Sequence, residues 1–263
     1  MQPRPITISA LEFDVLWEHL GIEEDMPLAV KVPSPGATHT ERKHLVAQAW
    51  AEMERRGVGR PVEIHPGLAH GLNVLARPDR EVDGRTWLGR SVRFLAASRG
   101  EDAVLAILAD NYVTIHSVAA SALPSVAIGV LAQIPAGPGG SVSLPARDFE
   151  TAANSGGGAR QGFEQALRNR GVREDDITTL SAMINDVVAT GNLGVAARDR
   201  WGKRHRGERV VAFFDTGEGR YVQIRRASPD GSMWTTISPA DNRRLLHHVE
   251  QILGEVVRVA EEK

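Results

Sequence analysis

The residues best suited to chemistry lie in the stretch FFDTG, residues 213–217. An Asp-Thr-Gly that follows two apolar residues suggests hydrolysis by paired carboxylates, which needs two acids sharing one proton. The corresponding turn in the first half of the chain is ADN, residues 109–111, and no Thr-Gly follows its acid. One aspartate without its twin favours a plain hairpin turn, with Asp215 bonded to the local backbone and with Gly217 and Gly219 at positive φ.

Other stretches give weaker chemical signals. GGGARQG, residues 156–162, looks like a phosphate-binding loop, but it follows a helix and no Lys-Ser/Thr comes after it, so we expect a flexible connector. The histidine pairs 39/44 and 65/70 have a spacing of five, which does not align on one helix face, and no HExxH motif occurs. Cysteine is absent, which excludes disulfides, thiolate metal sites and a Cys nucleophile, and fits a reducing compartment. The sequence therefore predicts no metal and no cofactor.

The charge balance bears on which partners are possible. Lys plus Arg number 31 and Asp plus Glu 33, a formal net charge of −2, which argues against a general nucleic-acid binder. The basic stretch WGKRHRGER, residues 201–209, falls between predicted strands, so a solvated hairpin tip is favoured over an RNA-associated module. The N-terminal MQPRPITIS has no apolar core of signal-peptide length, and the longest apolar segment, 121–134, is shorter than the roughly 20 residues of a membrane span. We expect a cytoplasmic globular protein without membrane insertion.

The elements that must position these residues follow from apolar spacing. Capping boxes at residues 9–12 and 38–41 mark two helix starts, the first directly after a short strand, and a third helix is expected at about 66–76. From 80 to 120 the apolar period changes to two and the turns are short, which predicts an antiparallel meander. An uncharged helix at about 121–133 should pack onto that meander.

The second half of the chain repeats this order of elements. ITISALEFD, from Ile6, and VSLPARDFE, from Val142, both read as a strand, a turn and a helix start, and VLAILADNYVTI matches VVAFFDTGEGRYVQI. Any strand–cap–helix junction resembles another, but the agreement in order favours duplication, with half-repeats at about 6–134 and 141–258. The predicted fold class is α+β: two similar halves with antiparallel sheets and packed helices, related by a pseudo-two-fold axis. Further helices are predicted at about 146–153, 161–169, 175–186 and from Ser238–Pro239 onward, with strands at about 187–201, 209–216, 220–227 and 232–237.

Four segments in this order resemble the EspG family, ESX (type VII) secretion-associated proteins of actinobacteria: ALEFDVLWEHLG, MPLAVKVPSPGATHTER, VVAFFDTGEGRYVQIRR and WTTISPAD. The resemblance runs from about residue 6 to about 253. It implies a single EspG-like domain over 1–263 with quasi-two-fold related halves. It also implies a cytosolic chaperone that binds PE–PPE heterodimers, or another ESX substrate protein, at the helical tip of the PPE protein and keeps them soluble and secretion-competent. No enzyme activity, cofactor, metal or nucleotide is implied.

The resemblance also implies where the partner binds. The family's contacts lie on the loop joining the first two meander strands, here TWLGRS (86–91), and on helices of the C-terminal half, here DITTLSAMINDV (176–187). This loop is shorter than in several mycobacterial members. The alternative for the loop is packing onto a sheet edge, and for the helix an ordinary core. The runner-up function is an aspartic-protease-like hydrolase centred on Asp215, and the oligomeric state, monomer or homodimer, is left open. The predicted partner-binding residues are Trp87, Leu88, Arg90, Leu180, Met183, Ile184 and Val187.

Overall fold

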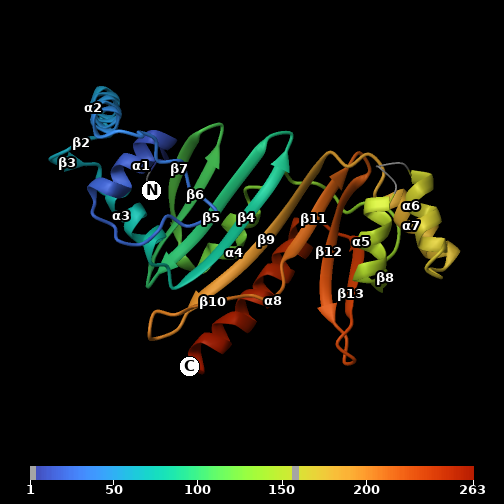
Figure 1. The fold of residues 1–263 in the computed structure, drawn as a ribbon. Coiled ribbons are helices and arrows are strands. Elements are labelled where there is room, and N and C mark those ends of the chain that lie inside the picture. Colours follow the sequence, from blue (N-terminus) through green and yellow to red (C-terminus); the bar gives the residue numbers. More distant parts are fainter. Residues whose placement is uncertain (1–3, 156–159) are drawn as a thin grey trace.

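The computed structural model describes residues 4–155 and 160–263, and its centre is one antiparallel sheet of 11 strands (Figure 1). The strand order is β1-β7-β6-β5-β4-β9-β11-β12-β13-β8, with β10 paired to β9 outside this path, and β2 and β3 form a separate two-stranded sheet. The strands are β1 (Ile6–Ser9), β2 (Gly59–Arg60), β3 (Glu63–Ile64), β4 (Arg80–Leu88), β5 (Ser91–Arg99), β6 (Asp102–Ala109), β7 (Tyr112–Ala119), β8 (Val142–Pro145), β9 (Ala189–Arg198), β10 (Arg204–Arg206), β11 (Val211–Thr216), β12 (Gly219–Ala227) and β13 (Met233–Pro239). The helices are α1 (Ala10–His19), α2 (His39–Arg55), α3 (Pro66–Ala76), α4 (Leu123–Ile128), α5 (Ala146–Ser155), α6 (Arg160–Arg168), α7 (Glu174–Met183) and α8 (Asn242–Glu261).

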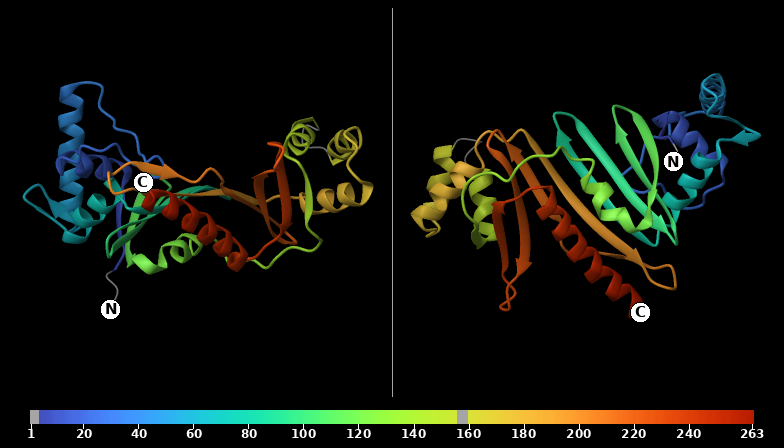
Figure 2. Two further views of the ribbon diagram at one scale, coloured as in Figure 1. Left: turned by 90° about the horizontal axis from the view of Figure 1, so that it is seen from below. Right: turned by 180° about the vertical axis from the view of Figure 1, so that it is seen from behind.

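Helices cover both faces of the sheet, but they leave part of one face open (Figure 2). On the front face, which is turned to the viewer in Figure 1, α1–α3 pack over β5–β7 and α5–α7 pack over β12, β13 and β8. On the back face α8 packs over β4, β9 and β11, with α4 beside it. Side chains alternate along a strand, so Phe213 points to α8 while Phe214 points to the front face. The middle strands β4 and β9 therefore carry exposed side chains on the front face.

Most first-half elements begin and end where the sequence predicts. In the first capping box the Ser9 hydroxyl accepts from the Glu12 N–H at 3.2 Å, and the Glu12 carboxylate accepts from the Ser9 N–H at 2.7 Å. Thr38 and Glu41 form the second box at the start of α2. Helix α3 and the meander β4–β7 also occupy the predicted ranges. In the described part of the chain, no helix has both the length and the apolar character that crossing a membrane requires.

Outward from the central β4–β9 pair, both halves add strands in the same chain order. One side continues β5, β6, β7 and β1, and the other continues β11, β12, β13 and β8. The strands of ITISALEFD and VSLPARDFE thus form the two edges, and each leads directly into a helix. The α+β class with packed helices on antiparallel sheet is confirmed, whereas the pseudo-two-fold axis and the half-repeats 6–134 and 141–258 stay predictions.

The second sequence match between the halves is displaced by one strand. VLAILADNYVTI forms β6 and β7, but the sheet position of the hairpin β11–β12 corresponds to β5–β6. Alternating apolar residues around a short polar turn look alike in every hairpin of a meander, so letters alone cannot fix which hairpin corresponds to which.

The predicted start of the last helix is wrong. Ser238 and Pro239 continue β13 as its final residues, where Pro239 lies opposite Tyr221 of β12. Helix α8 begins three residues later, with Asp241 as the N-cap that accepts from the Arg244 N–H at 2.8 Å. Proline is tolerated at a strand end as well as at a helix start, so the Ser-Pro pair carried an ambiguous signal.

Two other predicted helices are shorter than expected. The helix expected at 121–133 is regular only over α4, with Gly129 as its C-cap. The helix expected at 175–186 is α7, which ends at Met183. Asp186 takes φ of 51°, a left-handed conformation that cannot continue a right-handed helix.

The linker between the halves crosses the sheet at a close backbone contact. The Arg220 N–H donates to the Pro135 carbonyl at 2.9 Å, and the Gly137 N–H donates to the Arg220 carbonyl at 3.1 Å. Gly219 has φ of +141°, and a Cβ on it would lie 2.6 Å from the Cα of Gly137. Only glycine fits at positions 137 and 219. The linker PAGPGG (135–140) is therefore packed tightly against β12 where it crosses the sheet, and we call this contact the linker crossing.

Each outer edge of the sheet is only four residues long. On β1, the Arg56 guanidinium donates to the Thr7 carbonyl at 3.0 Å and pairs with Glu12 at 2.6 Å. On β8, Pro145 is the last residue of the strand and has no N–H to offer a neighbour. Both edges therefore present few free backbone groups.

Candidate functional site

An apolar surface lies at the end of the sheet where β4 finishes and β9 starts. Trp87 is 55% exposed and Val188 is 60% exposed, so both present apolar surface to solvent. Val187 is also exposed, and Leu88 is half-buried against the α8 core. The register places Leu88 opposite Ala189, so the residues just before β9 adjoin the end of β4. Trp87 points to the front face and Leu88 to the back face, and we call the end of the sheet formed by Trp87, Leu88, Val187 and Val188 the sheet-end surface.

Arg90, the third residue predicted in this loop, lies in the turn between β4 and β5. Its side chain is exposed and pairs with Asp110 in the turn between β6 and β7. The two turns therefore stand side by side at the same end of the sheet (Figure 1). An exposed pair of this kind contributes little to stability, and either side chain can turn to another protein.

The structure separates the four residues predicted on the C-terminal helix. Leu180 and Met183 are 0% and 1% exposed, and both belong to the core between α5–α7 and the sheet. They are not at the surface, so the core alternative is correct for these two. Ile184 is half-buried against the same core, and Val187 alone is exposed. The sequence analysis missed Val188. Val187 and Val188 are both exposed because they lie between the end of α7 and the start of β9.

Starting from Trp87 of the sheet-end surface, four exposed side chains follow the front face of β4 and β9. Arg85 and Trp87 alternate with buried residues on β4, and Thr190 and Asn192 lie opposite Trp87 and Arg85 on β9. We call these four residues the central strip. Their side chains are exposed, whereas helices pack on the front face to either side of them.

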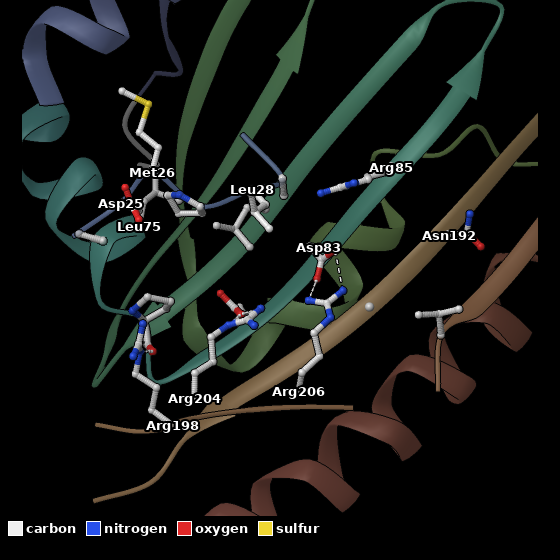
Figure 3. A pocket seen from close by; sticks show the side chains of 18 residues that line it. Asp25, Met26, Leu28, Leu75, Asp83, Arg85, Asn192, Arg198, Arg204 and Arg206 are labelled. Atoms are coloured by element: carbon white, nitrogen blue, oxygen red, sulfur yellow. Dashed lines mark hydrogen bonds and ion pairs between the residues drawn. The ribbon is translucent and has the colours of Figure 1, made fainter. Parts of the chain in front are cut away.

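A pocket of about 510 Å³ continues from the central strip toward β10 (Figure 3). The segment 25–29 forms one wall, where Leu28 is exposed toward the pocket. Arg198 lines the lower end and donates to the carbonyls of Pro78 at 3.1 Å and of Gly202 at 2.8 Å. The pocket therefore combines apolar walls with several guanidinium groups.

The basic stretch 201–209 forms part of this pocket. It is a hairpin, as predicted, but its β10 side chains reach across β9 to β4 and are not simply solvated. Arg206 contacts both oxygens of Asp83, at 2.5 and 3.0 Å, and Arg204 pairs with Glu81. These arginines are committed to carboxylates, which weakens the case for an RNA module at this stretch.

The turn that begins this hairpin is fixed by Asp199. One of its oxygens accepts from the N–H groups of Trp201 and Lys203, both at 2.9 Å, and the other is 2.9 Å from His205 Nε2. The bond to His205 is the main reason that the pKa of Asp199 lies below its ordinary value. Trp201 itself is 76% exposed at the far end of β9 from Trp87.

Asp215 has a different role from the one expected of it. It is buried and does not bond to the local backbone; its two oxygens receive the Arg220 guanidinium at 2.6 and 2.8 Å. Arg220, which is 0% exposed, also donates to Asn242 at the start of α8. Gly219 takes positive φ as predicted, but Gly217 does not. Both oxygens of Asp215 are bound to Arg220, so the arrangement joins β11, β12 and α8.

The glycine-rich stretch 156–162 lies partly outside the described residues. Residues 156–159 are not described, and 160–162 open α6, where Arg160 pairs with Glu164 at 2.8 Å. The flexible connector expected at 156–162 is thus helical in the part that can be seen.

The comparisons with known proteins bear on the whole chain. Among curated proteins, none matches this sequence. A solved structure of the type VII secretion system chaperone EspG5 of Mycobacterium tuberculosis, in complex with the PE25–PPE41 dimer, has the same fold with a TM-score of 0.70 at 19% identity. The match covers 95% of this chain and 96% of that chain. The family model of the EspG family matches residues 9–251, and the chain therefore belongs to the EspG family.

Proposed function

We propose that this protein is a chaperone for ESX (type VII) secretion substrates such as PE–PPE heterodimers. It binds the helical tip of the PPE protein and keeps the pair soluble until secretion. Membership of the EspG family and a shared fold with EspG5, solved in complex with PE25–PPE41, support this role. The chain acts as one domain in the cytoplasm, and it works by binding alone, with no catalysis and no cofactor.

The observation that carries the proposal is the sheet-end surface. Trp87, Val187 and Val188 are exposed apolar side chains at the end of the sheet where β4 finishes and β9 starts. A large aromatic side chain set among aliphatic ones is the composition of a binding hot spot, in which a few residues supply most of the binding free energy. Arg90, in the turn that follows β4, and the half-buried Ile184, just after α7, complete the proposed contact surface.

Co-expression tests the function directly. We expect the chain to co-elute in size-exclusion chromatography with a PE–PPE pair encoded by its own source genome. If no pair or other ESX substrate of that genome co-elutes with the folded chain, the proposed function is wrong. The size of the complex also separates a monomeric from a dimeric chaperone.

Two tryptophans test the surface. Trp87→Ala should weaken binding of the co-eluting pair by about 30-fold, the effect of losing about 2 kcal/mol at a hot spot. Trp201→Ala is the matched control, because Trp201 is an exposed tryptophan at the opposite end of β9. Equal affinities for the two variants, measured by calorimetry, would exclude the sheet-end surface as the binding site without excluding the chaperone function.

A further inference from the structure

Two arginines face each other across the front face of the sheet. Arg85 on β4 and Arg93 on β5 are paired in register, so their side chains point to the same face from directly opposite positions. Like charges in such a pair destabilise a sheet. Burial and the neighbouring charge of Arg85 together lower the pKa of Arg93 below its ordinary value.

No carboxylate in the described part of the chain forms an ion pair with either of these arginines. Arg85 makes no hydrogen bond to another described side chain, and Arg93 donates only to the Lys31 carbonyl at 3.0 Å. The nearest acid along β4 on this face is Asp83, and both of its oxygens are taken by Arg206. Figure 3 shows Arg85 standing apart from that pair. The sheet therefore carries two adjacent positive charges that it does not neutralise itself.

These charges adjoin the sheet-end surface. Arg85 and Trp87 are two residues apart on β4 and point to the same face, and Asn192 lies opposite Arg85 on β9. A protein docked on Trp87 extends over Arg85 if it follows the strand. A carboxylate reaching this position meets two guanidinium groups and a side-chain amide, a donor set suited to bidentate hydrogen bonding.

We propose that Arg85, Arg93 and Asn192 form a carboxylate-binding subsite that selects substrates with an acidic side chain beside the apolar helical tip. The proposal rests on the proposed function and adds the partner's chemistry to it. Apolar contact at the sheet-end surface supplies affinity, and this charged subsite supplies orientation and selectivity among similar helical tips.

The test uses the PE–PPE pair that co-elutes with the unmodified chain. Arg85→Gln should weaken its binding about tenfold and flatten the dependence of affinity on salt concentration. Arg85→Glu should weaken binding further. Replacing the responsible acid on the PPE tip by arginine should restore binding to the Arg85→Glu variant but not to the unmodified chain. Arg258→Gln is the matched control, because Arg258 is exposed on α8, behind the sheet.

The outcomes distinguish a failure of the chaperone function from a failure of the subsite. If the unmodified chain binds no pair, the chaperone function and the subsite both fail. If the pair binds Arg85→Gln and Arg93→Gln as tightly as the unmodified chain, with the same salt dependence, the subsite alone is wrong. The subsite is also wrong if Arg85→Gln instead abolishes binding of a single-stranded RNA oligonucleotide while the pair binds unchanged.

Discussion

Arg220 is a buried cation whose position links three elements. It lies on β12, its guanidinium binds Asp215 on β11 and Asn242 on α8, and its backbone carries the linker crossing. The Nδ2 atom of Asn242 has no hydrogen-bond partner in the described structure, so the network is not complete. A buried pair of this kind is sensitive to loss of one member, because the other is left charged in a medium that solvates it poorly.

Arg220→Met should therefore reduce the free energy of unfolding by about 3–5 kcal/mol. The matched control is Arg60→Gln, which breaks the exposed pair of Arg60 with Glu63 and should change stability by less than about 1 kcal/mol. Urea denaturation followed by circular dichroism measures both. Similar midpoints for the two variants would contradict the role of Arg220.

Two histidines predict how stability depends on pH. Burial lowers the pKa of His116 and of His248 below the ordinary 6.5, and His248 is also surrounded by cations. When the pKa of a histidine is lower in the folded than in the unfolded state, its contribution to the free energy of unfolding is fully present above pH 6.5. That contribution is lost as the pH falls below 6.5 through the folded-state pKa. The cations that face His248 are Arg244 and His247 on α8, Arg226 on β12 and Arg209.

We expect the free energy of unfolding to fall between pH 7 and pH 5.5, and to fall less in the His116→Gln/His248→Gln variant. Urea midpoints at several pH values measure this difference. His39→Gln provides a control, since the His39 side chain is exposed. A steeper slope in the double variant would reverse the assigned direction of these pKa values.

At the scale of elements, the linker crossing has a defined steric limit. Gly219→Ala places a methyl group against the backbone of Gly137 and forces a side chain into positive φ, which should cost about 1–3 kcal/mol. Gly217→Ala, in the same turn, meets nothing within 4 Å and does not have positive φ, so it should be nearly neutral. Thermal unfolding of the two variants compares them directly. Equal destabilisation by the two variants would show that the backbone at the linker crossing shifts to accommodate the added methyl group.

The elements were predictable where one local signal decided the conformation. Capping boxes at 9–12 and 38–41 fixed two helix starts, and the alternation over 80–120 fixed the meander. Prediction failed where two conformations suit the same residues, as at Ser238–Pro239. It also could not assign the outward face of α7, because an apolar stripe is the same pattern whether it packs inside or binds a partner.

The site was only half visible in the sequence for a related reason. Trp87 was predicted only through the family resemblance, which places partner contacts on the loop 86–91, and no sequence pattern assigned a role to Arg85. The proposed role of Arg85 depends on the strand register that places Arg93 opposite it, and on the ion pair by which Arg206 already neutralises Asp83. Such a pairing involves residues far apart in the chain, and no local pattern reports it.

At the scale of the whole molecule, α8 joins the two halves. Its buried side chains, including Leu245 and Val249, share one core with Val82 and Phe94 of the first half. The long β4–β9 pairing adds a second junction between the halves. A core shared in this way favours a single cooperative unfolding transition.

Leu245→Ala should lower the free energy of unfolding by about 2–5 kcal/mol while the transition stays single. Tryptophan fluorescence and far-ultraviolet circular dichroism should then give one midpoint. Leu28→Ala, at an exposed leucine, is the control and should be almost neutral. Two separate transitions in the Leu245 variant would show that the halves are independent folding units.

The short, protected edge strands β1 and β8 bear on whether copies of this chain can aggregate. A long open strand edge invites further strands to add, and it is the usual starting point for fibril growth. Here Arg56 occupies a carbonyl on one border and Pro145 withholds a donor on the other. Copies of this chain at high concentration are thus discouraged from pairing edge to edge.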